Sequence, residues 1–177
     1  DPFLNEICAS AAKMIGPTAF CIMNILGEEL AIQIANYAPP IMGDNAPPTC
    51  LPRGSQVCNF VVYKNKPVVF PQEAMHAGTH GAMQFYTGIP MQCPATGHAL
   101  GSFCIMDVVP HPELTEADVH KLQMLCTSAM HHIELRKLRL DVFRLSSQRQ
   151  ALEQETLSRR GVPKGDSELT TFVCTDI

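Results

Sequence analysis

The stretch QFYTGIPMQCPATGHALGSFCIMDVV, residues 84 to 109, decides the fold. It consists of two apolar, strand-forming runs, separated by a turn with proline and glycine at residues 94–97. Two such runs around a short turn predict a long antiparallel hairpin.

A second hairpin is predicted upstream. The apolar run TAFCIMNIL (18–26) reads as a buried strand, Gly27–Glu29 as a turn, and LAIQIANY (30–37) alternates apolar and polar residues. Before it, residues 3–15 carry apolar side chains at helical spacing, and Gly16–Pro17 ends that helix.

The segment between the hairpins is less regular. Residues 38–54 hold five prolines, so we expect a long loop without regular structure. Residues 55–70 predict a short helix and then a strand, and 71–83 predict a loop or broken helix. This order of elements indicates an α+β fold, in which an antiparallel sheet carries helices on one face.

A long C-terminal helix is predicted from Leu114 to Arg160, where the chain has neither proline nor glycine. Thr115 is the expected N-cap, with Asp118 three residues later. A heptad pattern counted from Val119 is mostly apolar at first and turns polar near Ser147. We expect the first half to pack on the sheet and the second half to form a parallel two-chain coiled coil, hence a homodimer. The alternative is a long helix that folds back on its own domain.

Composition restricts the class of protein. The net charge of −4 gives no reason to expect nucleic acid or an anionic membrane as a partner, and no apolar run reaches the roughly 18 residues of a membrane span. The eight cysteines contain no CxxC pair, and several lie in apolar runs. We therefore expect mostly free, buried thiols in a reducing, cytoplasmic compartment.

A spaced set of residues runs from the segment before the second hairpin to the start of the long helix: Ser55, Cys58, Pro67, Val68, Phe85, Tyr86, Gly88, Pro90, Leu100, Gly101, Cys104, Asp107, Pro110, Leu114 and Thr115. Through these residues, the chain from residue 1 to about 140 resembles a GAF domain. The resemblance implies a regulatory sensor that binds a small molecule, or a module that only dimerises. We expect Gly101 to lie close to another backbone, and Asp107 to have a structural role by accepting backbone hydrogen bonds in a turn.

The ligand pocket implied by this resemblance would be capped by loops. The predicted pocket residues are Arg53, Ser55, Cys58, Asn59, His76, His80 and Phe85. No cofactor is firmly implied: the Cys-His dipeptide of bilin-binding members and the Asn-Lys-Phe-Asp-Glu motif of cyclic-nucleotide-binding members are absent, and for haem only His76 or His80 is a candidate axial ligand. A redox role for Cys58 or Cys93 stays open because both adjoin loops.

The segment ELTTFVCTDI, residues 168–177, resembles the opening strand of class III nucleotidyl cyclases. In that family the aspartate of the Asp-Ile pair binds the catalytic metal, which assigns Mg²⁺ binding to Asp176 in a full-length cyclase. The predicted organisation is a GAF sensor at 1–140, a signalling helix at 141–165 and the start of a cyclase domain at 166–177. A tail that is β-like by chance is the alternative.

These resemblances imply that the chain itself is not an enzyme and that it regulates a cyclase through the helical linker. Two other functions remain open. One is a ligand-free dimerisation module. The other is a GAF-type free methionine sulfoxide reductase, which would need Cys50, Cys58 and Cys93 clustered in the pocket loops.

Overall fold

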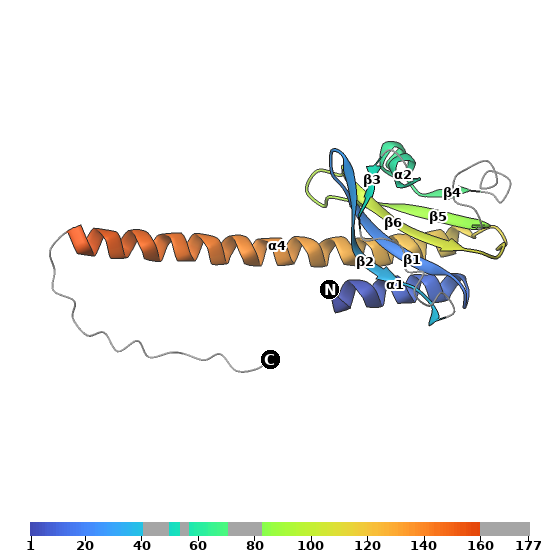
Figure 1. Cartoon of the computed structure of the whole chain (residues 1–177), viewed down its shortest axis with the longest axis horizontal. Coiled ribbons are helices and arrows are strands. Elements are labelled where there is room, and N and C mark those ends of the chain that lie inside the picture. The colour runs from blue at the N-terminus through green and yellow to red at the C-terminus, as the bar shows by residue number, and fades with distance from the viewer. Residues whose placement is uncertain (41–49, 54–56, 71–82, 160–177) are drawn as a thin grey trace. The chain divides into compact units, whose positions relative to one another are not determined.

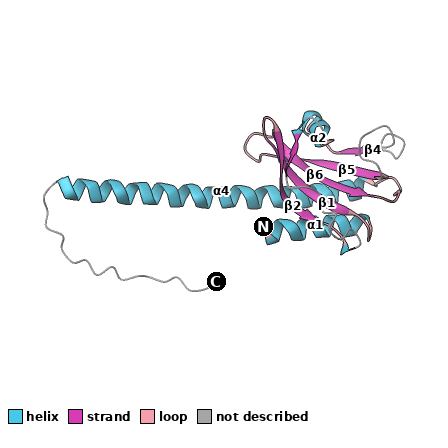
Figure 2. Ribbon diagram, viewed as in Figure 1, coloured by secondary structure: helices cyan, strands magenta, loops and turns pink. Residues whose placement is uncertain are grey.

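The computed structural model describes residues 1–40, 50–53, 57–70 and 83–159. Two compact units follow each other along the chain, residues 1–134 and 135–177. The elements of the first unit are drawn in chain colours in Figure 1 and by type in Figure 2. The predictions for Ser55, His76, His80 and Asp176 lie outside the described residues.

The two predicted hairpins are the centre of the sheet. Strands β1 (Phe20–Leu26) and β2 (Leu30–Tyr37) form the first hairpin, and β5 (Phe85–Gln92) and β6 (Ala99–Asp107) form the second. Antiparallel pairing of β1 with β6 joins them. Gly97 has a φ of 71° in the β5–β6 turn, a backbone conformation that suits glycine.

Short strands extend both edges of this centre. Strands β3 (Cys50–Pro52) and β4 (Val68–Phe70) complete a six-stranded sheet of order β3-β2-β1-β6-β5-β4 among the described residues. The expectation that residues 38–54 contain no regular structure is therefore wrong for β3. Proline is tolerated there because an edge strand leaves one side of its backbone unpaired.

Helix α1 and the first part of α4 cover one face of the sheet. Asp1 caps α1 (Pro2–Ile15) by accepting from the backbone N–H groups of Phe3 and Leu4. Helix α4 runs from Glu116 to Arg159, and the predicted cap is confirmed: the Asp118 N–H donates to Thr115 Oγ1 over 3.2 Å. Residues of α1 and of the first part of α4 share one buried core with the sheet, as predicted for the first half of that helix.

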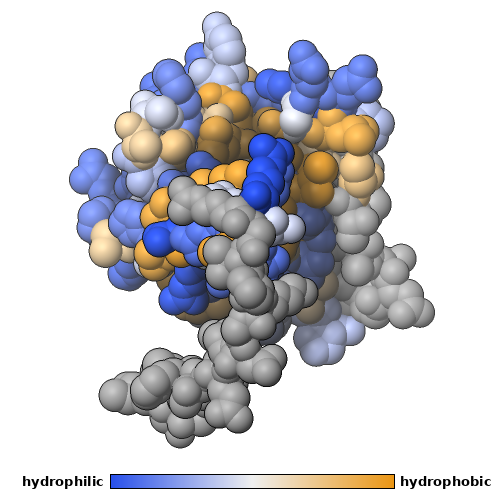
Figure 3. All heavy atoms as spheres, turned by 90° about the vertical axis from the view of Figure 1, so that its left-hand side faces the viewer, coloured by the Kyte–Doolittle hydropathy of each residue, from blue (hydrophilic) through white to orange (hydrophobic). Residues whose placement is uncertain are grey.

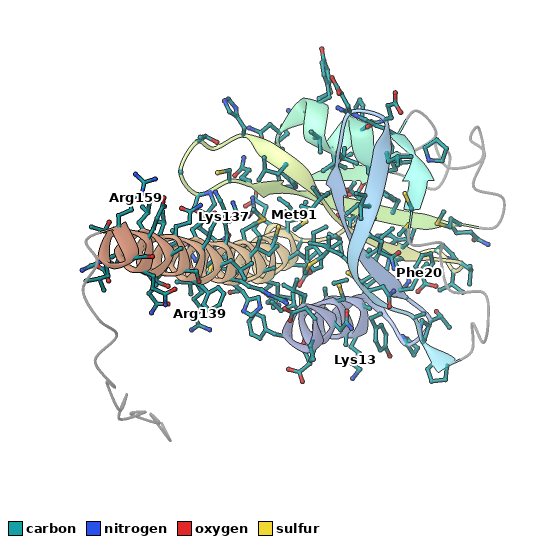
Figure 4. The ribbon with its side chains drawn as sticks, turned by 60° about the vertical axis from the view of Figure 1, so that its left-hand side comes forward. Lys13, Phe20, Met91, Lys137, Arg139 and Arg159 are labelled. Atoms are coloured by element: carbon teal, nitrogen blue, oxygen red, sulfur yellow. The ribbon has the colours of Figure 1, made fainter. Side chains whose placement is uncertain are left out.

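The opposite face carries the short helix α2 (Cys58–Lys64), seen above the sheet in Figure 1. Its residues Cys58 and Val61 belong to a second core with strand residues such as Phe20 and Tyr86. The predicted α+β class is confirmed. The prediction placed the helices on one face of the sheet; this holds for α1 and the first part of α4, while α2 covers the other face. Phe20 and Met91, labelled in Figure 4, belong to the α2-side core and the α1/α4-side core respectively.

In the second unit, α4 continues to Arg159 with exposed side chains throughout its described length. Lys137, Arg139 and Arg159 project outward from the helix in Figure 4. The i,i+4 pairs Arg149–Glu153 and Arg159–Glu155 support the helix locally. The predicted domain boundary at residue 140 stays a prediction. No helix among the described residues is both long and apolar enough to cross a membrane.

Candidate functional site

Polar side chains interrupt the apolar α2-side face of the sheet at its centre. The register pairs Asn24 of β1 with Ser102 of β6, and Cys104 with both Ile22 and Gly88. Since side chains alternate along a strand, Asn24, Ser102 and Cys104 lie on one face. Asn24 is 4% exposed and Ser102 is fully buried, so these polar groups need partners inside the protein.

Helix α2 supplies the main partner. Cys58, its first residue, places its sulfur 3.5 Å from the sulfur of Cys104 and 3.4 Å from Asn24 Nδ2, which donates to it. The Tyr86 hydroxyl lies 3.1 Å from the Cys104 sulfur, and Ser102 Oγ lies 3.2 Å from the same sulfur. We call these five residues, Asn24, Cys58, Tyr86, Ser102 and Cys104, the thiol cluster.

Gly88 provides the space for this cluster. A Cβ at residue 88 would collide with Val61 of α2 and would lie 2.9 Å from the Tyr86 hydroxyl. A side chain there would therefore push α2 or the tyrosine away from the cysteines. This explains physically why glycine occupies the middle of a buried strand.

The cluster shifts the pKa values of its two thiols in opposite directions. A hydrogen bond from Cys104 lowers the pKa of Cys58 from 9.0 to about 6 against the effect of burial, with further support from Ser102, Asn24 and Tyr86. Burial and the neighbouring Cys58 raise the pKa of Cys104 well above its ordinary value, and burial with the cysteine charges raises that of Tyr86. The surroundings therefore favour the thiolate form of Cys58 and the thiol form of Cys104.

Two other predicted pocket residues, Arg53 and Asn59, are joined at the start of α2; Asn59 lies in the helix and Arg53 follows β3. The Arg53 guanidinium donates through Nε to Asn59 Oδ1 over 3.1 Å and through Nη1 to the Gly27 carbonyl over 2.9 Å. Asn59 in turn donates to the Arg53 carbonyl. The structure thus joins Arg53 to Asn59, which neighbours Cys58 in α2, and these bonds tie the β1–β2 turn to the helix.

Phe85 is not brought together with Cys58. Alternation along β5 places it on the opposite face from Tyr86, where its ring lies 5.0 Å from the His111 ring in an edge-on arrangement. Phe85 is 4% exposed and packs inside the domain.

Asp107 has the structural role predicted for it. Its buried carboxylate accepts from the backbone N–H groups of Val108 and Val109, and Thr18 Oγ1 donates to it over 3.0 Å. His111 Nε2 lies 2.7 Å from the same group. These bonds fix the end of β6 to the start of β1 and to the segment before α4.

A groove of about 460 Å³ lies on the other side of the domain, between the β5–β6 turn, the turn after α2 and α4. Its lining includes Asn65, Lys66, Gln92, Cys93, Gln123 and His131. Hydrogen bonding to Thr96 and to nearby backbone lowers the pKa of Cys93. Among the described residues, no group of three or more His, Cys, Asp or Glu side chains is placed to hold a metal ion.

The sequence predicts Cys58 as a site residue. Asn24 and Ser102 were missed, and Tyr86 and Cys104 were named only as residues that carry the family resemblance. The available signal was a polar residue inside each apolar strand, Asn24 in FCIMNIL and Ser102 in GSFCIMD. Their pairing depends on the β1–β6 register, which joins segments far apart in the chain. The groove was missed because its lining comes from separate turns and a helix.

A six-stranded antiparallel sheet with α1 and the first part of α4 on one face and α2 on the other defines an α+β domain. The family model described as GAF domain matches residues 1–133 of the 177-residue chain. The chain therefore belongs to the GAF domain family, and the predicted resemblance is confirmed for this region.

Solved structures show the same fold. The GAF domain of an Acinetobacter phosphoenolpyruvate-protein phosphotransferase matches with a TM-score of 0.62 at 14% identity, over 78% of this chain and 84% of that one. The blue-light absorbing form of the Thermosynechococcus elongatus PixJ GAF domain matches with a TM-score of 0.60 at 9% identity, over 82% and 92%. A free methionine-R-sulfoxide reductase from Neisseria meningitidis, in complex with its substrate, matches with a TM-score of 0.58 at 15% identity, over 77% and 78%. No curated protein matches the chain.

Proposed function

We propose that this chain is a regulatory GAF domain that dimerises through α4 and controls a C-terminal class III nucleotidyl cyclase. Membership of the GAF family supports the regulatory role. The resemblance of residues 168–177 to the opening strand of such cyclases supports the choice of effector. Asp176 lies outside the described residues, so the proposed metal site rests on sequence alone.

The observation that carries the proposal is the change of surface along α4. In the first unit the apolar residues Leu122, Cys126 and Ala129 are buried in the domain's own core. In the second unit, large apolar side chains of the helix are more than half exposed: Leu135, Leu138, Leu140, Val142, Phe143, Leu145, Leu152 and Leu157. Five of them, Leu135, Leu138, Val142, Leu145 and Leu152, form the apolar stripe on which the proposal rests. Figure 3 shows that apolar and hydrophilic side chains are mixed on the face that it presents.

The spacing of this stripe suits a second copy of the same helix. Its members follow each other at intervals of three, four, three and seven residues, which is the a/d spacing of a two-chain coiled coil. This register differs from the one counted from Val119, whose members Leu122, Cys126 and Ala129 belong to the domain's own core. A paired α4 would transmit a change in the sensor as a change in the separation or register of two effector domains.

The experiment is a cyclase assay on the full-length protein with ATP and GTP in the presence of Mg²⁺. Asp176→Asn should abolish cyclic nucleotide formation because it removes a metal-binding carboxylate, and it should leave the dimer intact. Full activity of Asp176→Asn, or absence of any cyclase activity in the parent protein, would contradict the choice of effector.

Whether the domain binds a small molecule is tested independently of the cyclase assay. Absorption spectra and a thermal-shift panel of cyclic nucleotides distinguish a small-molecule sensor from a ligand-free dimerisation module. A visible absorption band indicates haem or another chromophore, and a nucleotide-dependent rise in melting temperature indicates binding. No response to any of them favours the module that only dimerises.

Reduction of free methionine sulfoxide is the second candidate function. The observation that favours it is the contact between the Cys58 and Cys104 sulfurs, in a fold shared with proteins named as free methionine-R-sulfoxide reductases. The predicted clustering of Cys50, Cys58 and Cys93 has less support, since β2, β1 and β6 stand between edge strand β3 and the strand before Cys93. Turnover of free methionine-R-sulfoxide with thioredoxin, lost in Cys58→Ser, would establish this function in place of the regulatory one.

A further inference from the structure

The thiol cluster is a chemically asymmetric dithiol that dimerisation and cyclase control leave unused. Its two sulfurs come from residues 46 positions apart, on α2 and on β6, and they are 3.5 Å from each other. A disulfide needs a sulfur–sulfur distance of about 2.05 Å, so closure requires an approach of roughly 1.5 Å. This approach would have to come from rotation of the two side chains and a small adjustment of α2.

The two thiols have the different properties that oxidation to a disulfide requires. Cys58 accepts a hydrogen bond from Asn24 Nδ2 over 3.4 Å and lies against Cys104, and both donors favour its thiolate. Cys104 is fully buried between Tyr86 and Ser102, and its pKa is raised well above the ordinary range, so it stays a thiol. Cys58 is thus suited to attack an oxidant, and Cys104 lies close enough to react with the oxidised Cys58.

We propose that Cys58 and Cys104 are a redox modification site, at which a hydroperoxide converts the pair to a reversible disulfide that ties α2 to β6. This site does not depend on the identity of the effector domain. It gives the sensor domain an input that needs no bound ligand.

The chemistry balances in two steps. The Cys58 thiolate attacks one peroxide oxygen, the S–O bond forms as the O–O bond breaks, and the leaving hydroxide or alkoxide takes up a proton. This gives a sulfenic acid on Cys58. The Cys104 sulfur then attacks the Cys58 sulfur, the S–S bond forms as the S–O bond breaks, and hydroxide leaves with the Cys104 proton as water. Two electrons pass from the sulfurs to the peroxide, and a dithiol reductant reverses the change.

The test uses the 177-residue chain in which three other cysteines are replaced: Cys50→Ser, Cys93→Ser and Cys174→Ser. Cys50 is exposed, Cys93 is partly exposed, and Cys174 lies outside the described residues. We call this triple replacement the core-cysteine variant. It is treated with hydrogen peroxide, remaining thiols are alkylated, and peptides are mapped by mass spectrometry without reduction. The expected result is a Cys58–Cys104 linked peptide that disappears when dithiothreitol is added before alkylation.

Cys126 is the matched internal control. Cys58 and Cys126 are each 3% exposed, but burial raises the pKa of Cys126 to about 12, while that of Cys58 is about 6. A much larger fraction of Cys58 than of Cys126 is thiolate, which makes Cys58 react faster with peroxide. A thiolate of low pKa is a weaker nucleophile, and this reduces the difference in rate. We expect Cys58 to be oxidised roughly a hundredfold faster than Cys126.

Two further variants separate the steps. In the core-cysteine variant with Cys104→Ser, Cys58 should stop at the sulfenic acid, which dimedone traps. With Cys58→Ser, Cys104 should remain reduced. Circular dichroism shows whether each variant is folded.

Three outcomes would overturn the proposal. The first is a Cys58 that stays reduced under peroxide in the folded protein. The second is oxidation of Cys58 and Cys126 at similar rates. The third is a disulfide between Cys8 and Cys21, whose buried side chains are hydrogen-bonded to each other, formed as fast as the one between Cys58 and Cys104.

Discussion

At the scale of single residues, Cys58 and Cys126 show how partners and burial act on the same group. Both thiols are 3% exposed. The Cys126 sulfur donates to the Pro90 carbonyl at 3.6 Å, and burial raises its pKa. Cys58 lies among hydrogen-bond donors, and its pKa is lowered to about 6. The identity of the neighbouring groups therefore decides reactivity here, and burial alone does not.

The first prediction concerns the titration of Cys58. In the core-cysteine variant, the thiolate absorbance in the far ultraviolet should fall with a midpoint near pH 6 as the pH is lowered. Asn24→Leu removes a donor to the thiolate and should move the midpoint upward, whereas Cys126→Ser should leave it unchanged. A thiolate signal that appears only near pH 9.0, the ordinary value, would contradict the account.

Stability should follow the same titration. The pKa of Cys58 is lower in the folded state than the ordinary 9.0, so its contribution is complete above pH 9.0 and is lost as the pH falls through about 6. Above pH 9.0 the raised pKa of Cys104 acts in the opposite direction. Urea unfolding of the core-cysteine variant should show a rise in the free energy of unfolding from pH 6 to 9 that Cys58→Ser lacks. Equal slopes for the two proteins would rule out this linkage.

A further residue-scale prediction compares two glycines of the second hairpin. At Gly101 a Cβ would collide with the backbone carbonyl oxygen of Asn24, while at Gly97 it would meet open space. Gly101→Ala should cost about 3 kcal/mol or more, because backbone atoms of the central β1–β6 pair must move. Gly97→Ala should cost only about 1 kcal/mol, from the left-handed backbone. Similar losses in thermal unfolding would contradict the close approach assigned to Gly101.

At the scale of elements, the sequence predicts what depends on local pattern. Both hairpins, α1, the short helix with the strand after it, and the Thr115 cap of α4 all follow from periodicity and turn residues. β3 was missed because three residues beside prolines carry no periodic signal, and pairing with β2 makes the strand. The thiol cluster was not recognised because it depends on the register between β1 and β6 and on the position of α2 over Gly88.

The element-scale prediction concerns α2. A Cys58–Cys104 disulfide would close a loop of 46 residues and stabilise the domain by about 4 kcal/mol in the chain-entropy model. Peroxide should therefore raise the melting temperature of the core-cysteine variant by several degrees, with no rise in its Cys104→Ser form. An equal rise in both would show that peroxide acts elsewhere, and a fall in the core-cysteine variant would mean that the bond strains the fold.

At the scale of the whole molecule, the account depends on α4. Its first part contributes to the core of the GAF unit, and its second part has an exposed apolar stripe in a different register. The heptads counted from Val119 place Leu140 at the interface of the coiled coil. The register of the exposed stripe places Leu145 at that interface instead. The two residues are each 64% exposed, so the same substitution at either site changes the surface to a similar extent.

The most direct test is therefore the molar mass in solution, measured by sedimentation equilibrium over a range of concentrations. The account predicts a dimer of the 19.4 kDa chain that persists in Leu140→Lys and is weakened at least about a hundredfold in Leu145→Lys. A parent chain that stays monomeric at high concentration would contradict dimerisation through α4. A dimer that Leu140→Lys dissociates and Leu145→Lys does not would contradict the stripe proposed as its interface.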